Sequence, residues 1–229
     1  MNPTLGITSR QNPLVQHLRK LGSDSDYRSD CGEFLGIGSK LLQEAESAGI
    51  SIGKKITNRD LTGYIAGMKS APDVVFSAFI PAPEQPQAVR FVLALEDVQD
   101  PGNVGTMLRS AYALGVDNVA LIGNCADIWQ PAVLRAAMGA AFKLFITNHL
   151  PENVPTIAAV IDDRSIDVRS LPKLDSGVLI IGNEGHGLRK ETIFKADYKV
   201  KIPIRGESLN AGAAAAILLW EIVSVNSGQ

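Results

Sequence analysis

Apolar runs with little polar alternation recur along the chain from residue 91 onward. They are FVLALED (91–97), NVALIG (118–123), KLFIT (143–147), IAAVID (157–162), GVLIIGN (177–183) and YKVKIPI (198–204). Runs of this kind predict strands that are buried on both faces. Helical patterns separate them at TMLRSAYALG (106–115) and PAVLRAAMGAAF (131–142), and SLNAGAAAAILLWEIV (208–223) predicts a last helix. The alternation indicates an α/β fold with a mainly parallel sheet.

The first 80 residues have a different pattern. Apolar residues at 14, 15, 18 and 21 give NPLVQHLRKLG (12–22) a helical spacing, and SKLLQEAESAG (39–49) predicts a second helix. With the short apolar runs EFLGIG (33–38) and DVVFSAFI (73–80), they indicate a small α/β domain. The proline-rich stretch IPAPEQPQAV (80–89) favours an extended linker. We therefore expect a domain at 1–80, a linker at 81–89 and a second domain at 90–229.

Composition narrows the class of protein. The chain has 229 residues, 45% of them hydrophobic, and a formal net charge of -2, which argues against a strongly basic nucleic-acid binder but permits a local basic surface. No uncharged apolar stretch is long enough for a membrane span, and the N-terminus lacks the apolar centre of a signal peptide, so we expect a cytoplasmic protein. Cys31 and Cys125 form no CxxC pair, so neither a disulfide framework nor a metal site is indicated.

Three polar loops are the candidate site. DPGNVGTMLRS (100–110), GNEGHGL (182–188) and RGESLN (205–210) each follow a predicted strand, and ligands of parallel sheets bind at the carboxyl ends of the strands. The first loop could hold a phosphate at a helix N-terminus, although it matches neither nucleotide fingerprint, G-x-G-x-x-G or G-x-x-x-x-G-K-[ST]. Alternatively, Pro101, Gly102 and Asn103 form only a turn and a helix cap. Arg109 borders the apolar stripe of the following helix, where a surface salt bridge is the alternative to a role in the site.

The other two loops leave similar alternatives open. Glu184 stands among three glycines, which leave the backbone open to a ligand. His186 could serve as a general base, but no Ser, Cys or second acid is spaced to complete a hydrolytic triad. Ser208 or Asn210 could merely cap the last helix. It is the joint occurrence of the three loops that indicates a function.

Taken together, DPGNVGTMLRSA, IIGNEGHGL and IPIRGESLNAGAAAAILLWE resemble, in order, the three motifs of the SpoU/TrmH branch of the SPOUT RNA methyltransferases. The N-terminal stretch resembles the family's small RNA-binding domain, which is related to ribosomal protein L30e. The resemblance implies methyl transfer from S-adenosyl-L-methionine to a ribose 2′-hydroxyl. It also implies a deep trefoil knot in the C-terminal domain and a homodimer whose sites form near the subunit interface.

The resemblance assigns roles to individual residues. The polar groups of the three motifs, which would carry out or orient the reaction, are Asn103, Arg109, Glu184, Ser208 and Asn210. Backbone contacts to the cofactor fall on Gly182, Ile202 and Leu209. No metal is implied. The third motif departs from the family's usual pattern in its shorter loop and in Ala-Gly-Ala, which stands where Val-Ser-Val is usual.

The expected substrate is RNA, with ribosomal RNA favoured over transfer RNA by analogy with family members that carry the extra N-terminal domain. The densest basic candidates for holding it are Arg10, His17, Arg19, Lys20, Arg28, Lys54, Lys55 and Arg59. Three other hypotheses remain open: a transfer-RNA methyltransferase, an RNA-binding knot protein without turnover, and, for want of a glycine fingerprint the weakest, a nucleotide-binding oxidoreductase.

Overall fold

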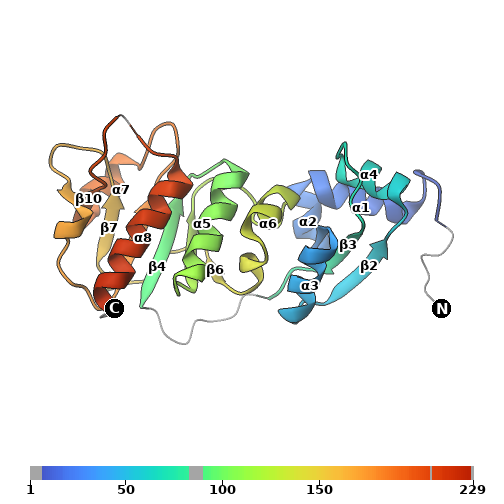
Figure 1. Ribbon diagram of the computed structural model, residues 1–229, viewed down its shortest axis with the longest axis horizontal. Helices are drawn as coiled ribbons and strands as arrows, with labels where there is room; N and C mark the ends of the chain where they lie inside the picture. The colour runs from blue at the N-terminus through green and yellow to red at the C-terminus, as the bar shows by residue number, and fades with distance from the viewer. Residues whose placement is uncertain (1–6, 83–89, 207, 228–229) are drawn as a thin grey trace. The chain divides into compact units, whose positions relative to one another are not determined.

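The computed structural model describes residues 7–82, 90–206 and 208–227, so most of the predicted linker lies outside the described residues. The chain forms two compact units (Figure 1). Unit 1 contains Met1–Ala82 and Asp127–Phe142, and unit 2 contains Pro83–Ala126 and Lys143–Gln229. The chain therefore contributes to unit 1 twice, and the second contribution comes from the part of the sequence expected to form the C-terminal domain.

Unit 1 is built on a three-stranded antiparallel sheet in the order β1-β3-β2. Its strands are β1 (Glu33–Ile37), β2 (Ile52–Ile56) and β3 (Val75–Phe79), and its first helices are α1 (Pro13–Ser23), α2 (Ser25–Cys31), α3 (Ser39–Ser47) and α4 (Arg59–Ala66). The side chains of Asn12 and Asn58 cap α1 and α4 by accepting backbone N–H groups. The apolar stripe predicted for the first helix is buried, because Val15, Leu18 and Leu21 pack into one core.

The segment 127–142 completes unit 1. It contains α6 (Pro131–Ala137) and a short 3-10 helix, η1 (Ala140–Phe142). The ring of Phe34 in β1 stacks on Trp129 and Phe142, with centroid distances of 5.3 and 5.6 Å. The single helix expected over 131–142 is wrong, because Met138 and Gly139 have φ angles of 51° and 86°, which end α6 in a left-handed turn.

Arg28 ties this segment to the helices of unit 1. It is 4% exposed, its guanidinium donates to the Asp127 carboxylate at 2.7 and 2.6 Å, and it also donates to the carbonyl of Leu21. The expectation that Arg28 belongs to an accessible basic surface is therefore wrong. A buried guanidinium needs a carboxylate partner, and here that partner lies 99 residues further along the chain.

Unit 2 contains a seven-stranded sheet in the order β6-β5-β4-β9-β7-β10-β8. The strands are β4 (Phe91–Glu96), β5 (Asn118–Ile122), β6 (Phe145–Thr147), β7 (Thr156–Ala159), β8 (Ile166–Asp167), β9 (Gly177–Ile181) and β10 (Tyr198–Lys201). Every neighbouring pair runs parallel. All residues of β4 and β9 are buried. The predicted α/β class with a parallel sheet is thus confirmed, whereas the trefoil knot stays a prediction.

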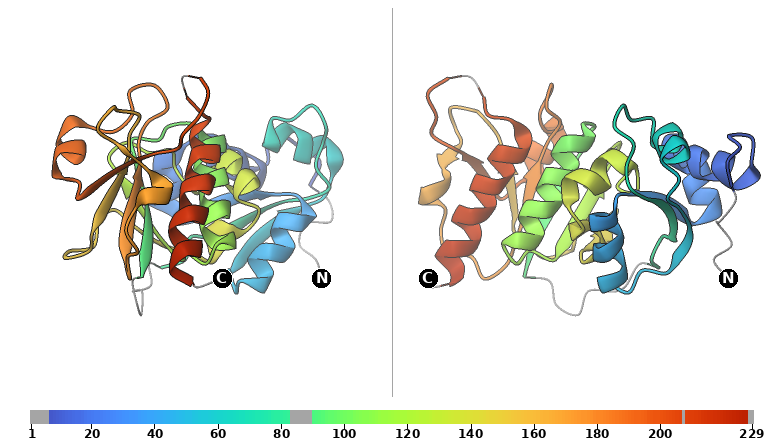
Figure 2. Two further views of the ribbon diagram at one scale, coloured as in Figure 1. Left: turned by 60° about the vertical axis from the view of Figure 1, so that its left-hand side comes forward. Right: turned by 45° about the vertical axis from the view of Figure 1, so that its right-hand side comes forward.

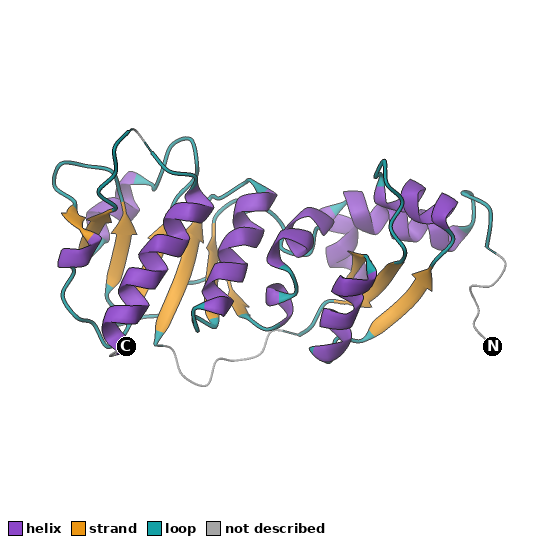
Figure 3. Cartoon of the chain, in the orientation of Figure 1, coloured by secondary structure: helices purple, strands orange, loops and turns teal. Residues whose placement is uncertain are grey.

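The helices of unit 2 are α5 (Pro101–Ala113), α7 (Lys190–Lys195) and α8 (Ala211–Ser227), with a 3-10 turn, η2 (Val168–Ser170). α5 and α8 lie side by side in both views of Figure 2, and Figure 3 shows them in front of the strands. A Cβ on the buried Gly212 of α8 would stand 3.1 Å from Cγ2 of Thr106 in α5, so this glycine permits the close approach of the two helices. Among the described helices, none is long and apolar enough to cross a membrane.

Strand order explains where the polar loops meet. From β4 the chain continues outward through β5 to β6, whereas β9 lies on the other side of β4, so the strand order reverses between β4 and β9. A reversal of this kind opens a crevice at the carboxyl ends of the strands. The loops 100–110 and 182–188 follow these two neighbouring strands, and the loop 205–210 leads into α8, which packs beside α5.

Candidate active site

Hydrogen bonds between side chains join the three loops. Nδ2 of Asn103 donates to Oε1 of Glu184 at 2.9 Å, and Nδ2 of Asn210 donates to Oδ1 of Asn103 at 2.8 Å. Asn103 is therefore the central member, bonded to a residue 81 positions away and to another 107 positions away. We call these three side chains the amide network. The structure thus brings together one predicted site residue from each of the three loops.

The first turn of α5 places Asn103. The carboxylate of Asp100 accepts the backbone N–H of Asn103 at 2.7 Å, and Pro101 occupies the first turn, where a missing N–H is tolerated. The cap is therefore made by Asp100, and the side chain of Asn103 is free for the amide network. The alternative in which Asn103 is itself the helix cap does not hold.

Asn183 shapes the loop that carries Glu184. It is 9% exposed; its Nδ2 donates to the carbonyl of Asp97 at 2.8 Å, and its Oδ1 accepts the N–H groups of Gly185 and His186. A Cβ on Gly182 would lie 2.4 Å from the backbone of Gly187, so only glycine allows the loop to fold back this tightly. The loop is consequently fixed at its base, and Glu184 is exposed at its tip.

Asn210 has two tasks. Its Oδ1 accepts the N–H of Ala213 at 3.2 Å and so caps α8, while its Nδ2 is the donor to Asn103. The sequence left two interpretations of Asn210 open, a helix cap and a site residue. One side chain can serve both, because its oxygen and its nitrogen bind different partners.

Arg109 and Ser208 lie outside the amide network. Arg109 is on α5, six residues beyond Asn103, which corresponds to about 9 Å along a helix. Its side chain is exposed, on the same side of α5 as Thr106, and forms neither an ion pair nor a hydrogen bond with any residue that the structure describes. Ser208 is also exposed, and the described part of the chain offers its hydroxyl no hydrogen-bond partner.

A second polar cluster braces the ends of β4 and of the loop 182–188, and the sequence reading missed it. Asp97 has a φ of 55°, and its carboxylate binds the guanidinium of Arg189 at 2.6 Å and accepts the N–H of Asn124. The backbone N–H of Asn124 and the Arg189 side chain hold the pKa of Asp97 below its ordinary value. The buried Glu96 accepts the N–H of Arg189 at 2.7 Å and the hydroxyl of Thr192. The sequence does contain a signal for this cluster, because two acidic residues, Glu96 and Asp97, come directly after the apolar run 91–95.

The residues expected to hold the cofactor follow the same edge of the sheet. Gly182 follows β9, Ile202 follows β10, and Leu209, which is 39% exposed, precedes α8. A Cβ on Gly187 or on Gly206 would meet nothing within 4 Å, so there is open space beside these two glycines. In the described residues no cluster of three His, Cys, Asp or Glu side chains could hold a metal ion.

Comparisons with known proteins identify a family for this chain. The model of the SpoU rRNA Methylase family matches residues 90–220. The chain is 32% identical over 247 residues to the 23S rRNA (guanosine(2553)-2′-O)-methyltransferase RlmP of Bacillus subtilis, and the match covers 94% of this chain and 98% of that protein.

Two solved structures are similar over both units. The AdoMet-bound rRNA methyltransferase from Sinorhizobium meliloti has a TM-score of 0.86 and 27% identity, covering 96% of this chain and 97% of the other. The SpoU methyltransferase AviRb from Streptomyces viridochromogenes, in complex with AdoMet, has a TM-score of 0.83 and 25% identity, covering 95% and 99%.

Proposed function

Because this chain belongs to the SpoU rRNA methylase family, we propose that its substrate is ribosomal RNA and that the amide network forms the centre of its active site. The protein is an RNA methyltransferase that acts on a ribose 2′-hydroxyl and uses S-adenosyl-L-methionine. The observation that carries the assignment of the site is the pair of hydrogen bonds from Asn103 to Glu184 and from Asn210 to Asn103.

Relatives that span both units support ribosomal over transfer RNA. RlmP and the Sinorhizobium meliloti enzyme, which match 94% and 96% of this chain, both carry ribosomal RNA in their names. Both of these relatives come from bacteria, whose ribosomes are in the cytoplasm, so they support the cytoplasm as the place of action. The tRNA alternative rests on relatives named for both RNAs, such as the Synechocystis protein of 29% identity.

The chemistry requires an activated hydroxyl. A ribose hydroxyl is a weak nucleophile until its proton leaves, and the reacting oxygen must be held in line with the methyl group. S-adenosyl-L-methionine supplies that methyl on a positively charged sulfur, held by the backbone at Gly182, Ile202 and Leu209. A guanidinium carries several N–H donors, so Arg109 acts by binding the hydroxyl oxygen and a neighbouring phosphate, which takes part in removing the proton.

The amide network holds the remaining groups in place. Asn103 fixes one carboxylate oxygen of Glu184, and the second oxygen is left to accept a hydrogen bond from the ribose or the cofactor. Asn210, which donates to the other end of the Asn103 amide, and Ser208, two residues before it, orient the same ligands. No proton transfer is assigned to these groups. Their contribution is position, which can be worth orders of magnitude in rate.

The exposed face of α5 and α8 supports a homodimer. Tyr112 of α5 and Ile217 and Trp220 of α8 are 41%, 40% and 58% exposed, and α5 and α8 lie side by side. Apolar side chains gathered on neighbouring helices suit a second copy of the chain. Arg109 is on the exposed side of α5 and outside the amide network of its own subunit, which supports the proposal that it acts on the amide network of the partner subunit.

Mixed dimers test this arrangement. If Arg109 acts across the interface, a dimer of one Arg109→Ala and one Asn210→Ala subunit keeps one complete site, and mixing the two impaired variants gives an activity well above that of either variant alone. If Arg109 acts within its own subunit, both sites in the mixed dimer are defective and mixing restores nothing.

The substrate is tested with RNA from a strain that lacks the gene. The purified protein is incubated with that RNA and radiolabelled S-adenosyl-L-methionine, and 2′-O-methylated positions are mapped by their resistance to alkaline cleavage. We expect one labelled site in ribosomal RNA. Label confined to transfer RNA would overturn the substrate, and cofactor binding without label in any RNA would favour a binding protein without turnover.

A further inference from the structure

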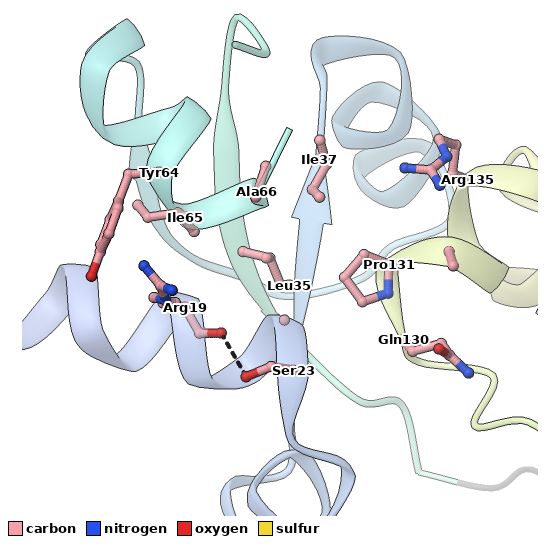
Figure 4. Close-up of a pocket in the computed structure, with 13 residues that line it drawn as sticks. Arg19, Ser23, Leu35, Ile37, Tyr64, Ile65, Ala66, Gln130, Pro131 and Arg135 are labelled. Carbon is pink, nitrogen blue, oxygen red and sulfur yellow. Dashed lines mark hydrogen bonds between the residues drawn. The ribbon is translucent and has the colours of Figure 1, made fainter. Parts of the chain in front are cut away.

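Unit 1 contains a pocket that no step of methyl transfer uses. It opens between α1, β1, α4 and the start of α6, and it has a volume of about 340 Å³ (Figure 4). This volume is at the lower end of the range of roughly 300–1,000 Å³ for small-ligand sites, large enough for one compact group. All of its walls belong to unit 1, and one of them is contributed by the segment 127–142.

The ends of the pocket are cationic. Arg19 of α1 and Arg135 of α6 line it, and Figure 4 shows them at opposite ends with Leu35 and Pro131 between them. None of the described lining residues is acidic. Neither arginine forms a salt bridge with a carboxylate in the described part of the chain. Two guanidinium groups without acidic partners favour a ligand that carries negative charge at two separated points.

Arg19 is also held in a defined orientation. Its guanidinium lies over the ring of Tyr64, 4.2 Å from the centroid, and Arg10 lies over the same ring at 4.7 Å. Cation–π contact fixes a planar group that is otherwise mobile. A guanidinium held in one orientation loses little conformational freedom when its N–H groups bind a phosphate.

The middle of the pocket is mainly apolar, and Gln130 adds a side-chain amide to its lining. Leu35, Ile37 and Pro131 form apolar lining between the arginines, and Ile65 lines the pocket beside Tyr64 (Figure 4). Gln130 also lines the pocket; it precedes α6 without capping it, and within the described residues its amide has no hydrogen-bond partner. A side-chain amide offers one donor group and one acceptor, the pattern that pairs with the edge of a base.

We propose that this pocket binds a single unpaired nucleotide of the RNA substrate, an inference that rests on the proposed function. The base lies on the apolar lining with its edge at Gln130, and the phosphates on its two sides contact Arg19 and Arg135. A free phosphate would make no use of the apolar lining, and a base within a duplex could not enter. A free mononucleotide shares the chemistry, so it is distinguished by experiment.

The experiment uses the full chain and two labelled probes: a single-stranded RNA 12-mer of mixed sequence, and a hairpin in which the same nucleotides are paired. Binding is measured by fluorescence anisotropy for three pocket variants, Arg19→Gln, Arg135→Gln and Ala132→Leu. The leucine fills the pocket without changing charge. Lys40→Gln, an exposed change of equal charge in unit 1 and outside the pocket, is the control.

We expect each pocket variant to weaken binding of the single strand by at least about fivefold, the lower end of what one stacked base contributes. Hairpin binding and the Lys40→Gln variant should change by less than about twofold. Equal losses for Arg135→Gln and Lys40→Gln would overturn the pocket in favour of diffuse attraction. So would full single-strand affinity in a folded Ala132→Leu variant. Arg135 is exposed, so its variant keeps the test decisive if Ala132→Leu does not fold.

Two further measurements separate the possible failures. Adenosine monophosphate is also titrated against the 12-mer. A lower dissociation constant for the mononucleotide than for the 12-mer would show that the pocket prefers a free mononucleotide and would overturn the RNA assignment. Methyl transfer to ribosomal RNA is assayed for every variant. If wild type methylates RNA while pocket variants bind and react normally, only the pocket proposal fails; if wild type methylates no RNA, the proposed function fails first.

Discussion

The two units hold their polar residues in different ways. In unit 2, side chains from three loops bind one another at the carboxyl ends of buried parallel strands, and the amide network results. In unit 1, the buried Arg28 pairs with Asp127, while Arg19 and Arg135 line a pocket. The comparison suggests a division of labour in which unit 2 is preorganised for chemistry and unit 1 for capture of a charged, flexible ligand.

The largest effect is expected at Arg109. Arg109→Ala should reduce methyl transfer by at least about a hundredfold, the scale of losing a group that activates the nucleophile. Binding of S-adenosyl-L-methionine, measured by calorimetry, should stay within a few-fold of wild type because backbone groups of the other two loops hold it. Turnover above a tenth of the wild-type rate would show that Arg109 does not activate the hydroxyl.

The next effect concerns the segment that completes unit 1. Asp127→Asn leaves the guanidinium of Arg28 buried without a counter-charge, which should lower the free energy of unfolding by about 2–3 kcal/mol. This is below the usual cost for a fully buried pair because the Asp127 side chain is 27% exposed. The unfolding of unit 1 in urea measures this loss. Glu46→Gln breaks the exposed pair with Lys55 and should change the same transition by less than about 0.5 kcal/mol.

A shift of similar size in the two variants would mean that the segment 127–142 is held by its apolar contacts alone. In that case the stacking of Phe34 on Trp129 and Phe142, and not the ion pair, fixes the wall of the pocket.

The difference between the units also explains what the sequence could predict. The three residues of the amide network lie next to elements with clear periodicity: Glu184 follows β9, Asn103 is in the first turn of α5, and Asn210 precedes α8. Their meeting at one edge of the sheet therefore follows from strand order. The boundary of unit 1 was not readable in this way. Asp127 and Trp129 lie within the range 90–220 that matches the family model, yet their partners are in the first 34 residues. Contacts between such distant segments leave no periodic signal.

Residues that act through backbone geometry were equally hidden. The positive φ of Asp97 and the tight folding around Gly182 depend on Asn183, Arg189 and the end of β4 at once. A sequence reading finds the glycines and the charges but not their partners. It also does not place Arg109, whose proposed target belongs to another copy of the chain.

A moderate effect is expected at Asn210, where two substitutions separate its tasks. Asn210→Asp keeps the oxygen that caps α8 but removes the donor to Asn103, so methyl transfer should fall about tenfold or more through misplacement, with stability nearly unchanged. Asn210→Ala also loses the cap, so it should reduce the free energy of unfolding by about 1 kcal/mol as well. Initial rates and thermal unfolding of both variants check this. Full activity in Asn210→Asp would show that the network is structural only.

The smallest effect is expected when Asp97 loses its charge, and it appears in how the free energy of unfolding depends on pH. The backbone N–H of Asn124 and the guanidinium of Arg189 lower the folded-state pKa of this carboxyl. A lowered folded pKa means that the contribution is complete above the unfolded-state value of about 3.9 and is lost as pH falls through the folded value. Asp97→Asn should therefore be less stable than wild type at neutral pH, and the difference should shrink on acidification below about pH 4. Unfolding curves of both proteins between about pH 3 and 7 measure it. A difference that stays constant over this range would mean that Asp97 holds the end of β4 through geometry and not through its charge.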